Sequence, residues 1–528
     1  MKKFLSLVII TSAVFIMSSC HKSFLTSLAV NPNSPSGGTP ELILPGVLNS
    51  ITFNVSGLLY SDQAVWLGYW NYSGGYTYFT DQQTYKVTSG GPQSWGSWYG
   101  PLSNITIMMD LAKQPHYEEY AGIGEILEAL CFQYLVDDYN MVPYSQAMKG
   151  VGEMFPVYDP GQSVYKGIVA QIDTGMTLIE AGMADPQVVN PGSVSPAPDI
   201  MFGGNMKLWL AFANSLKLRI LVRESNVLSS GTIQAELAKT ASYGYLGLGQ
   251  DALVNPGYIN ADGKQNPIWS SLGTNAASAL HTDGYNLYKA GKYAMDFYKN
   301  TNDPRLAYFY TPNGVKLLDP NYSSPTVPAD TSKFSADPLG VQEIHGGSNI
   351  GPGVLKGATA PGVVMTASES LFLQAEAAAR GYISGDAQQL YQQGITASFE
   401  YLGVSSSSEN SDQLAADYYN QTGVTNVSWP SSPNAQIEAI LTQKWAALNG
   451  ISVAESWNDW RRTGYPIPAP NYANTSLNPN PHPLAGPHMP YRYFYPDVEF
   501  STNQDQLNKA TGGKAIDPYN DKIFWMPQ

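Results

Sequence analysis

The chain has 528 residues, of which 43% are hydrophobic and 13% charged, so its length predicts either several domains or one repetitive helical array. A net charge of −14 and a pI of about 4.8 exclude a protein that binds nucleic acid through a basic surface. Aromatic residues make up 12% of the chain, which together with the low charge content excludes a largely disordered protein.

The N-terminus is typical of an exported lipoprotein. Two lysines precede the apolar run 5–17, which is too short to span a bilayer as a mature anchor. Ser18 and Ser19 stand directly before Cys20, and small residues before a cysteine resemble a bacterial lipobox. We therefore predict that residues 1–19 are a lipoprotein signal peptide and that Cys20 carries the lipid, palmitate included. An ordinary cleaved signal with a chance cysteine is the alternative.

The next two segments differ in character. Residues 20–40 are rich in Ser, Pro, Gly and Asn, a composition that predicts a flexible tether. Residues 41–70 predict a helix, because Leu44, Val47 and Ile51 recur on one face.

Residues 60–99 contain twelve aromatic side chains, interleaved with glycines that follow no period. Such glycines predict loops. A surface loop carries so much aromatic area when something stacks on it. Trp66 and Tyr69 are expected in the core because the preceding helix extends to them.

The remaining rings of this aromatic loop suit a sugar ligand. Flat aromatic rings cover the apolar CH faces of a sugar, while amides and carboxylates bind its hydroxyls. Docking of a partner protein is the alternative use of such rings, and the sequence does not separate the two. The candidates for glycan stacking, with their polar partners, are Trp70, Asn71, Tyr72, Tyr76, Tyr78, Asp81 and Trp95.

Amphipathic helices follow the aromatic loop. Apolar residues recur at helical spacing over 123–140, 163–182 and 205–225. A stretch rich in Gly, Asn, Pro and Tyr then predicts irregular loops over about 244–364, with one modest helix near 285–299.

Two further pairs of helices are predicted in the C-terminal part. The first pair covers 366–382 and 387–403, and Thr366 has capping-box spacing to Glu369 at its start. The second pair covers 436–450 and 452–464, before a proline-rich loop region over about 466–500. Paired helices with short turns are typical of tetratricopeptide-like repeats.

The stretch ESWNDWRRTGYP, from Glu455 to Pro466, holds paired Trp and Arg side chains that could bind a ligand or fix a helix in the core. Ser452 and Glu455 have capping-box spacing, so we predict a short helix here. Its two indoles share one face and should pack on the preceding helix, while the arginines hold loop carbonyls or carboxylates. We interpret the stretch as a structural signature made by Trp457, Trp460, Arg461 and Arg462.

The sequence carries no recognisable catalytic motif. There is no His-Glu-x-x-His, no Cys-x-x-Cys and no Gly-x-Ser-x-Gly, so we predict no metal, no cofactor and no enzymatic activity. Asp137 and Asp138 could supply half of a glycosidase acid/base pair. Neighbouring helix residues face different directions, however, and we interpret the two acids as a solvated helix end.

Several stretches, in the same order along the chain, resemble the SusD/RagB family of outer-membrane nutrient-binding lipoproteins of Bacteroidetes, in its SusD-like branch. The resemblance rests on NPNSP with ELILPGVLNS, CFQYLVDDYNMVPYSQAM, KLWLAFANSLKLRILVR, DPRLAYFY, ASESLFLQAEAAARGY, QKWAAL and SWNDWRRTGYP, which together span about residues 31–466.

The resemblance implies a mostly α fold of about four tetratricopeptide-like hairpins, with a large loop-rich region packed against them. Residues 41–528 would then form a single SusD-like domain. It also implies that the middle loops reach the ligand site, which adds Trp269 and Tyr285 as ligand-binding candidates. A calcium ion occurs in some members, but no EF-hand-like run supports one here.

The function implied is capture of oligosaccharides outside the cell and their transfer to a SusC-like TonB-dependent outer-membrane transporter. The protein would sit in the outer membrane through its lipid, facing the exterior, although the residues after Cys20 lack the acids often found in surface-exposed lipoproteins. Alternatives are a peptide-capturing homologue, a surface glycoside hydrolase, and a purely structural plug or adhesin. The sequence does not reveal the ligand.

Overall fold

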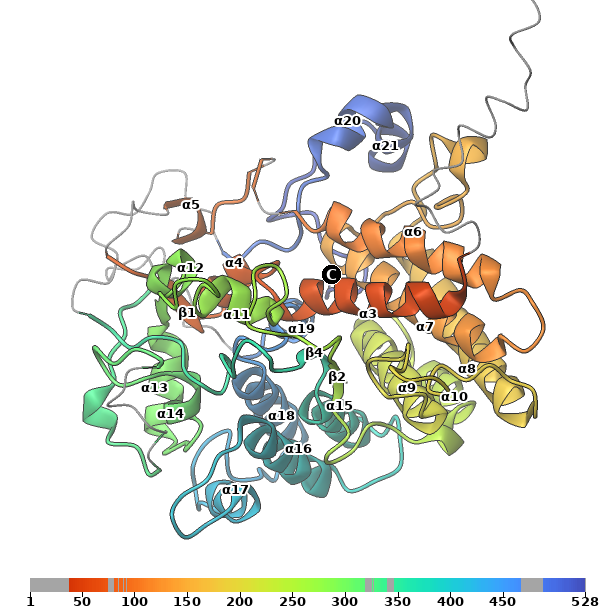
Figure 1. The fold of residues 1–528 in the computed structure, drawn as a ribbon. Coiled ribbons are helices and arrows are strands. Elements are labelled where there is room, and N and C mark those ends of the chain that lie inside the picture. The colour runs from red at the N-terminus through yellow and green to blue at the C-terminus, as the bar shows by residue number, and fades with distance from the viewer. Residues whose placement is uncertain are drawn as a thin grey trace, which may run out of the picture.

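The computed structural model describes residues 38–74, 80–83, 85–88, 90–91, 93–318, 325, 327–339, 346–466 and 488–527 (Figure 1). The predicted signal peptide, the predicted lipidation site Cys20, Tyr76 and Tyr78 lie outside the described residues. Most of the predicted proline-rich C-terminal loop also lies outside them.

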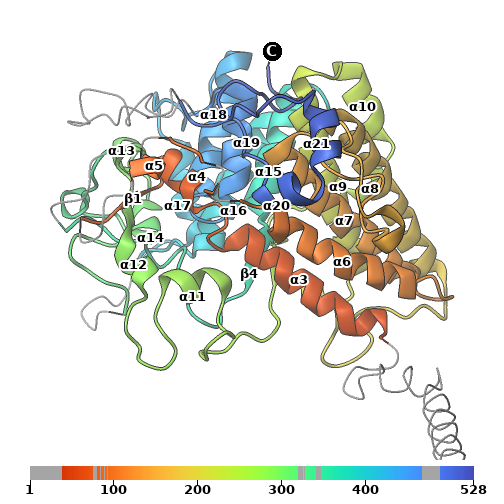
Figure 2. The ribbon, with the colours of Figure 1, turned by 90° about the horizontal axis from the view of Figure 1, so that it is seen from above.

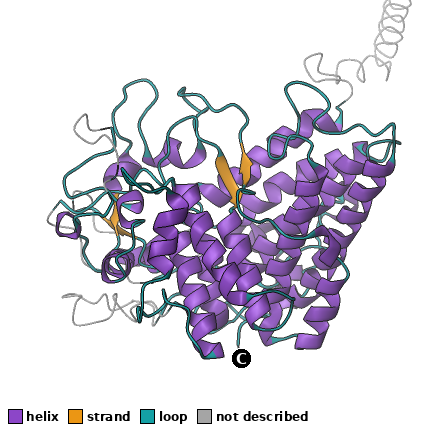
Figure 3. Ribbon diagram, turned by 90° about the horizontal axis from the view of Figure 1, so that it is seen from below, coloured by secondary structure: helices purple, strands orange, loops and turns teal. Residues whose placement is uncertain are grey.

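Helices make up most of the described fold, as predicted, and only short strands accompany them (Figure 3). The larger of its two regions, the helical scaffold, comprises α3 (Pro40–Ser56), α6 (Trp95–Leu111), α7 (Glu118–Tyr139), α8 (Gly161–Ala184), α9 (Met206–Arg223), α10 (Ser230–Ala238), α15 (Ala367–Ala379), α16 (Ala387–Leu402), α17 (Ser411–Tyr419), α18 (Pro433–Ala447) and α19 (Val453–Thr463). Consecutive helices pack on one another as hairpins: α6 on α7, α7 on α8, α8 on α9, and α15 on α16. The predicted helical fold is confirmed.

Helix α3 illustrates how the pattern of apolar residues sets the packing. Leu44, Val47, Leu48 and Ile51 are fully buried, and the helix lies along α6, as Figure 2 shows. Residues Pro40–Trp66 are long and apolar enough to cross a membrane, but the buried face of α3 packs inside the fold. Helix α3 is therefore a core helix in this structure.

The two predicted capping boxes have different outcomes. The hydroxyl of Thr366 accepts a hydrogen bond from the backbone N–H of Glu369 at 3.1 Å, so α15 is capped as predicted. The side chain of Ser452 caps nothing, and that prediction is wrong. The carboxylate of Glu455 is instead bound to Arg223 of α9, a stronger partner than a backbone N–H.

Opposite the helical scaffold lies a second region, the loop lobe, which comprises the described residues of 57–91 and 255–361 (Figure 1). Its elements are α4 (Ser61–Trp66), β1 (Trp70–Tyr72), α5 (Thr80–Gln83), α11 (Pro267–Leu272), α12 (Asp283–Leu287), β3 (Tyr288–Ala290), α13 (Lys292–Asn300) and α14 (Leu306–Phe309). Strand β2 (Ala252–Val254) pairs antiparallel with β4 (Gly362–Met365) where the loop lobe meets α3. Helices α20 (Asp497–Thr502) and α21 (Gln504–Thr511) lie near the C-terminus.

The single helix predicted near 285–299 is wrong, because strand β3 divides it into α12 and α13. Strand β3 pairs antiparallel with β1, and Tyr288 stands opposite Tyr72. Gly291 follows directly, and a Cβ there would lie 2.2 Å from the carbonyl oxygen of Gly68. Only glycine allows the two backbones to approach so closely. Gly291 thus separates the end of β3 from the start of α13.

A network of buried charges holds the helical scaffold together at its centre. Arg223 binds the carboxylates of Asp137 and Glu455, and Arg219 lies 2.9 Å from Glu369, with all five side chains at most 2% exposed. Burial alone would raise the pKa of Glu455, but Arg219 and Arg223 lower it to about 2. Helices α7, α9, α15 and α19 are thus joined by charge pairs that exclude water.

The ESWNDWRRTGYP stretch completes this network. Arg462 makes a bidentate pair with Glu376 at 2.6 and 2.7 Å, and Arg461 donates to the backbone oxygens of Asp137 and Tyr491 at 2.6 and 2.7 Å. Trp457 is fully buried and its indole N–H donates to the Pro490 carbonyl at 3.1 Å. The arginines bind carboxylates and carbonyls as predicted, and the stretch is a structural clamp.

The aromatic neighbours of the two indoles come from other segments, and their packing on the preceding helix stays a prediction. Trp457 contacts Trp66 and Tyr493, and Trp460 contacts Tyr491. The preceding helix α18 contributes Lys444, which lies 2.8 Å from Asp459. An ion pair thus links the two helices, and the rings next to the indoles come from α4 and from the C-terminal segment.

Candidate ligand-binding site

Strands β1 and β3 bring the two predicted loop regions together. The ring of Tyr288 lies 5.3 Å from that of Trp70 and 5.4 Å from that of Tyr72, measured between centroids. Trp70 is 2% exposed, Tyr72 3% and Tyr288 7%, so protein covers the faces of all three rings. The structure gives these rings packing partners, and the stacking role predicted for Trp70 and Tyr72 stays a prediction.

Asn71 is equally enclosed. Its amide nitrogen donates to the backbone oxygens of Asp337 and Pro338 at 3.0 and 3.1 Å, and its amide oxygen accepts from the backbone N–H of Tyr72 at 2.9 Å. The side chain therefore fastens the middle loops to the aromatic loop, and its hydrogen-bonding atoms are engaged with backbone groups.

An acid lies next to this aromatic group. Asp62 of α4 is 7% exposed, and burial raises the pKa of its carboxyl to about 7. The nearby Asp62 charge also raises the pKa values of Tyr72 and Tyr288, after the larger effect of their own burial. A carboxyl that titrates near neutrality therefore lies beside two tyrosines in an apolar surrounding.

Trp269 and Tyr285, the candidates from the middle loops, are also buried. Tyr285 is 1% exposed, its ring lies 4.3 Å from that of His281, and its hydroxyl accepts from the backbone N–H of Leu317 at 2.9 Å. Trp269 is 6% exposed, and its indole N–H has no hydrogen-bond partner among the described residues. Both residues lie in the loop lobe together with Trp70 and Tyr72, and their ligand-binding role stays a prediction.

Trp95 lies apart from the other candidates. Its ring contacts Tyr99, Tyr139, Tyr158 and Tyr495, at the start of α6 and beside the C-terminal segment. It is 8% exposed and lines a different cavity, next to α20. The structure therefore does not bring Trp95 together with Trp70, because the chain between them crosses from the loop lobe to the helical scaffold.

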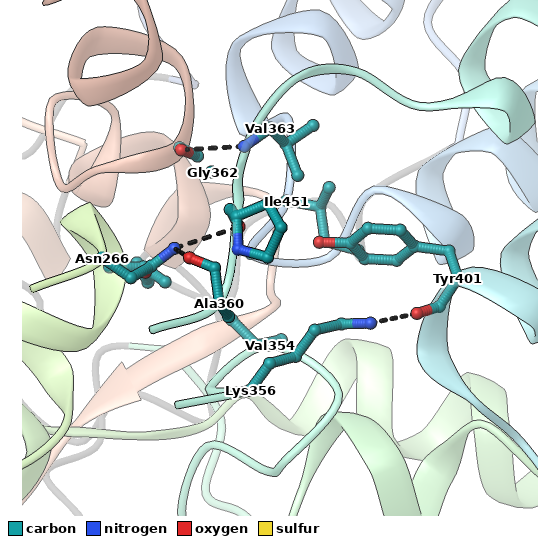
Figure 4. A pocket seen from close by; sticks show the side chains of 12 residues that line it. Asn266, Val354, Lys356, Ala360, Gly362, Val363, Tyr401 and Ile451 are labelled. Carbon is teal, nitrogen blue, oxygen red and sulfur yellow. Dashed lines mark hydrogen bonds between the residues drawn. The ribbon is translucent and has the colours of Figure 1, made fainter. Parts of the chain in front are cut away.

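The loop lobe meets the helical scaffold around a small cavity, shown in Figure 4. Asn266 donates to the carbonyls of Ala360 and Pro361 at 2.9 and 3.1 Å, which fixes the segment before β4. On the far side, Lys356 donates to the backbone oxygen of Tyr401 and stands 3.9 Å above its ring. Residues of α3, α16 and the loop lobe line this cavity, among them Ser56, Tyr401 and Ile268.

The sequence analysis missed Tyr288 and Asp62. Tyr288 belongs to a strand of three residues, too short for any alternation to show. Asp62 lies in an apparent surface position, two residues after Tyr60, and only the fold covers it. Tyr76 and Tyr78 lie outside the described residues, and Asp81 belongs to α5.

Asp137 and Asp138 do not form a solvated helix end, and that prediction is wrong. They are 0% and 2% exposed. The carboxylate of Asp137 is bound by Arg223, Tyr165 and Trp525, and that of Asp138 by Ser94 and Tyr60. Buried partners from the helical scaffold and from the loop lobe therefore bind both acids, which form part of the core.

Comparison with known proteins agrees with this architecture. Residues 38–496 match the SusD-like family described as "starch-binding associating with outer membrane", and the chain belongs to that family. It is a family of outer-membrane nutrient-binding proteins. No curated protein matches the chain.

Solved structures share the fold over nearly the whole chain. An outer-membrane protein of Bacteroides vulgatus connected with nutrient binding is 23% identical, with a TM-score of 0.71 over 93% of this chain and 100% of its own. A SusD homologue of Bacteroides fragilis is 20% identical, with a TM-score of 0.72 over 93% and 100%. A chitin-binding SusD homologue of Flavobacterium johnsoniae is 21% identical, with a TM-score of 0.69 over 91% and 98%.

Proposed function

We propose that the protein captures oligosaccharides at the outer face of the outer membrane and passes them to a SusC-like TonB-dependent transporter, without catalysing a reaction. Membership of a nutrient-binding outer-membrane family carries this proposal. The lipid on Cys20 would hold the protein at the membrane.

The loop lobe is the proposed place of glycan binding. Two segments that are more than 200 residues apart meet there through β1 and β3, and both are rich in aromatic residues. Since Trp70, Tyr72 and Tyr285 are already covered by protein, we assign the first stacking contacts to Tyr76 and Tyr78, with Asp81 as a polar partner. The buried Trp70, Tyr72 and Tyr285, together with Asn71 and Trp269, would support the residues that make those contacts. Trp95 would belong to a separate surface.

The choice of glycan rests on the similar proteins and on the charge of the chain. Two of the similar solved structures are of chitin-binding proteins, and the family description names starch. Chito-oligosaccharides and malto-oligosaccharides are therefore the first probes. The net charge of −14 favours neutral glycans over sulfated or uronic ones.

Affinity electrophoresis of the chain through gels that contain single polysaccharides tests the proposal. Retardation in one neutral glycan, and loss of that retardation in a Tyr76→Ala/Tyr78→Ala variant, is the expected result. Phe500→Ala is the matched control, because Phe500 is an aromatic residue of α20 that is 46% exposed. Binding of a peptide library in place of every glycan would favour the peptide-capturing alternative, and turnover of the glycan would favour a hydrolase.

The partner is tested separately. Purification of the tagged chain from the outer membrane of its own cells should bring down a TonB-dependent transporter at equal stoichiometry. Recovery of the chain alone from gently solubilised membranes would contradict this part of the proposal and leave glycan binding untouched.

A further inference from the structure

A third cavity lies on the helical scaffold, between α8, α9 and α10, at the other end of the molecule from α12–α14 of the loop lobe (Figure 1). Its volume of about 500 Å³ falls within the range of small-molecule sites. Val169, Leu221 and Leu228 supply apolar wall, and the exposed Lys166 stands on the rim.

Glu224 is the notable group in this cavity. It is 4% exposed, and its carboxyl lines the cavity without a hydrogen-bond or ion-pair partner among the described residues. A buried carboxyl without a partner is costly to a protein and is rarely kept. Burial raises its pKa to about 8, which fits a carboxyl that no cation of the protein stabilises.

Most of the surrounding charges are engaged with one another, while Lys166 on the rim makes no ion pair among the described residues. Lys217 lies 2.6 Å from Asp173, and Lys239 lies 2.7 Å from Glu236. Arg223, the residue before Glu224, binds Asp137 and Glu455 on its other side. Tyr165 of α8 also faces Glu224, and the Glu224 charge helps to raise the pKa of that hydroxyl after the larger effect of burial and of Asp137.

We propose that this cavity binds an organic cation, namely a protonated amine on a short apolar stem such as a lysine side chain. The ammonium group would donate to the Glu224 carboxylate, and the stem would lie against Val169, Leu221 and Leu228. A ligand cation supplies the partner that Glu224 lacks among the described residues, whereas an anion would meet Glu224, Glu236 and Asp173. The site is independent of the proposed glycan site.

The charge state of Glu224 gives the binding a defined pH dependence. With a pKa of about 8, the carboxyl is mostly protonated at pH 6 and must lose its proton when the amine binds. Affinity for an amine should therefore rise about tenfold from pH 6 to pH 7, and each bound amine should release a proton.

Isothermal titration calorimetry of the whole chain with pentylamine, and with 1-pentanol as a neutral ligand of the same length, tests the proposal. We expect saturable binding of pentylamine, at least tenfold weaker binding of 1-pentanol, and release of close to one proton at pH 7 when buffers of different ionisation heat are compared. Equal binding of the two ligands, or no saturable heat with pentylamine, would overturn the proposal, and neither comparison needs a variant.

Two variants localise the binding. Glu224→Gln should weaken pentylamine binding at least tenfold and remove its pH dependence, whereas Glu236→Gln on the rim should change it less than twofold. Undiminished binding by Glu224→Gln would refute the site. A Glu224→Gln protein that melts at or above the wild-type temperature at pH 8 shows that the loss is not a folding defect.

Discussion

The helical scaffold and the loop lobe are joined internally by different kinds of contact. In the scaffold, Arg223 and Arg462 are buried in pairs with carboxylates that come from distant helices. In the loop lobe, aromatic rings cluster around Tyr288, and Asn71 uses its side chain to bind backbone carbonyls. Charge pairs between distant helices therefore join the scaffold. In the lobe the buried pair of Arg305 with Asp303 is local in the chain, and ring packing and hydrogen bonds to the backbone join the two loop segments. Residue type alone did not tell which of these regions would bind a ligand.

The largest expected effect lies in the scaffold. Arg223→Ala leaves the carboxylates of Asp137 and Glu455 buried with fewer partners, and we expect a loss of about 3–5 kcal/mol in the free energy of unfolding. Denaturant unfolding followed by circular dichroism measures it. Lys113→Ala removes an exposed pair with Asp110 and should leave the stability unchanged within error. Equal, small losses in both variants would show that the buried network does not hold the scaffold.

A smaller and local effect is expected in the loop lobe. Asn71→Ala removes the donors to the carbonyls of Asp337 and Pro338, at a cost of about 1–3 kcal/mol. We expect faster amide hydrogen exchange in residues 327–339 and unchanged exchange in α7 and α9. If exchange rises equally throughout the chain, the lobe and the scaffold unfold as one unit and the comparison fails.

The smallest effect is a change of stability with pH at Asp62. Burial raises its pKa to about 7, above its value in the unfolded chain. The contribution of Asp62 to the free energy of unfolding is therefore greatest while the carboxyl is protonated in both states, and it falls as the pH rises to 7. The side chain in Asp62→Asn cannot ionise. The melting temperature of this variant, minus that of the wild type, should therefore increase between pH 4 and pH 7. A constant difference over this range would show that Asp62 is solvated in the folded protein.

Glu455 should show the opposite dependence. Its pKa of about 2 lies below the unfolded value, so its pairs with Arg219 and Arg223 stabilise the fold above pH 4.5 and are lost as the pH falls towards 2. Glu455→Gln should therefore be less stable than the wild type at pH 6, with a difference that shrinks at pH 3. Thermal unfolding at the two pH values distinguishes this behaviour from that of Asp62.

Local patterns predicted the scaffold helices but not the charges between them. The apolar spacing in α3 and α8 is enough to place those helices, because each buries one face, whereas α7 and α9 are buried almost all round. The partners of Arg219 and Arg223 lie up to 232 residues away, so no spacing rule connects them. For the same reason Asp137 and Asp138, which end a helix, looked solvated and are buried.

The ligand site could be predicted only in outline. The aromatic content of 60–99 and the family resemblance indicated that two loop regions meet. In the structure they meet through the antiparallel pairing of β1 with β3. Burial of Trp70 and Tyr72 depends on Tyr288, which comes from a strand too short to read in the sequence. An aromatic ring in a loop can face solvent or a distant neighbour, and composition does not separate the two.

The central claim is that the helical scaffold is structural and the loop lobe carries the glycan site. Calorimetric titration of the glycan found by affinity electrophoresis into the wild type, Tyr76→Ala/Tyr78→Ala and Phe500→Ala tests it most directly. We predict at least a tenfold loss of affinity in the double variant at an unchanged melting temperature, and wild-type affinity in Phe500→Ala. Full affinity in the double variant, together with loss of binding in Phe500→Ala, would move the site to the α20 surface and contradict the account.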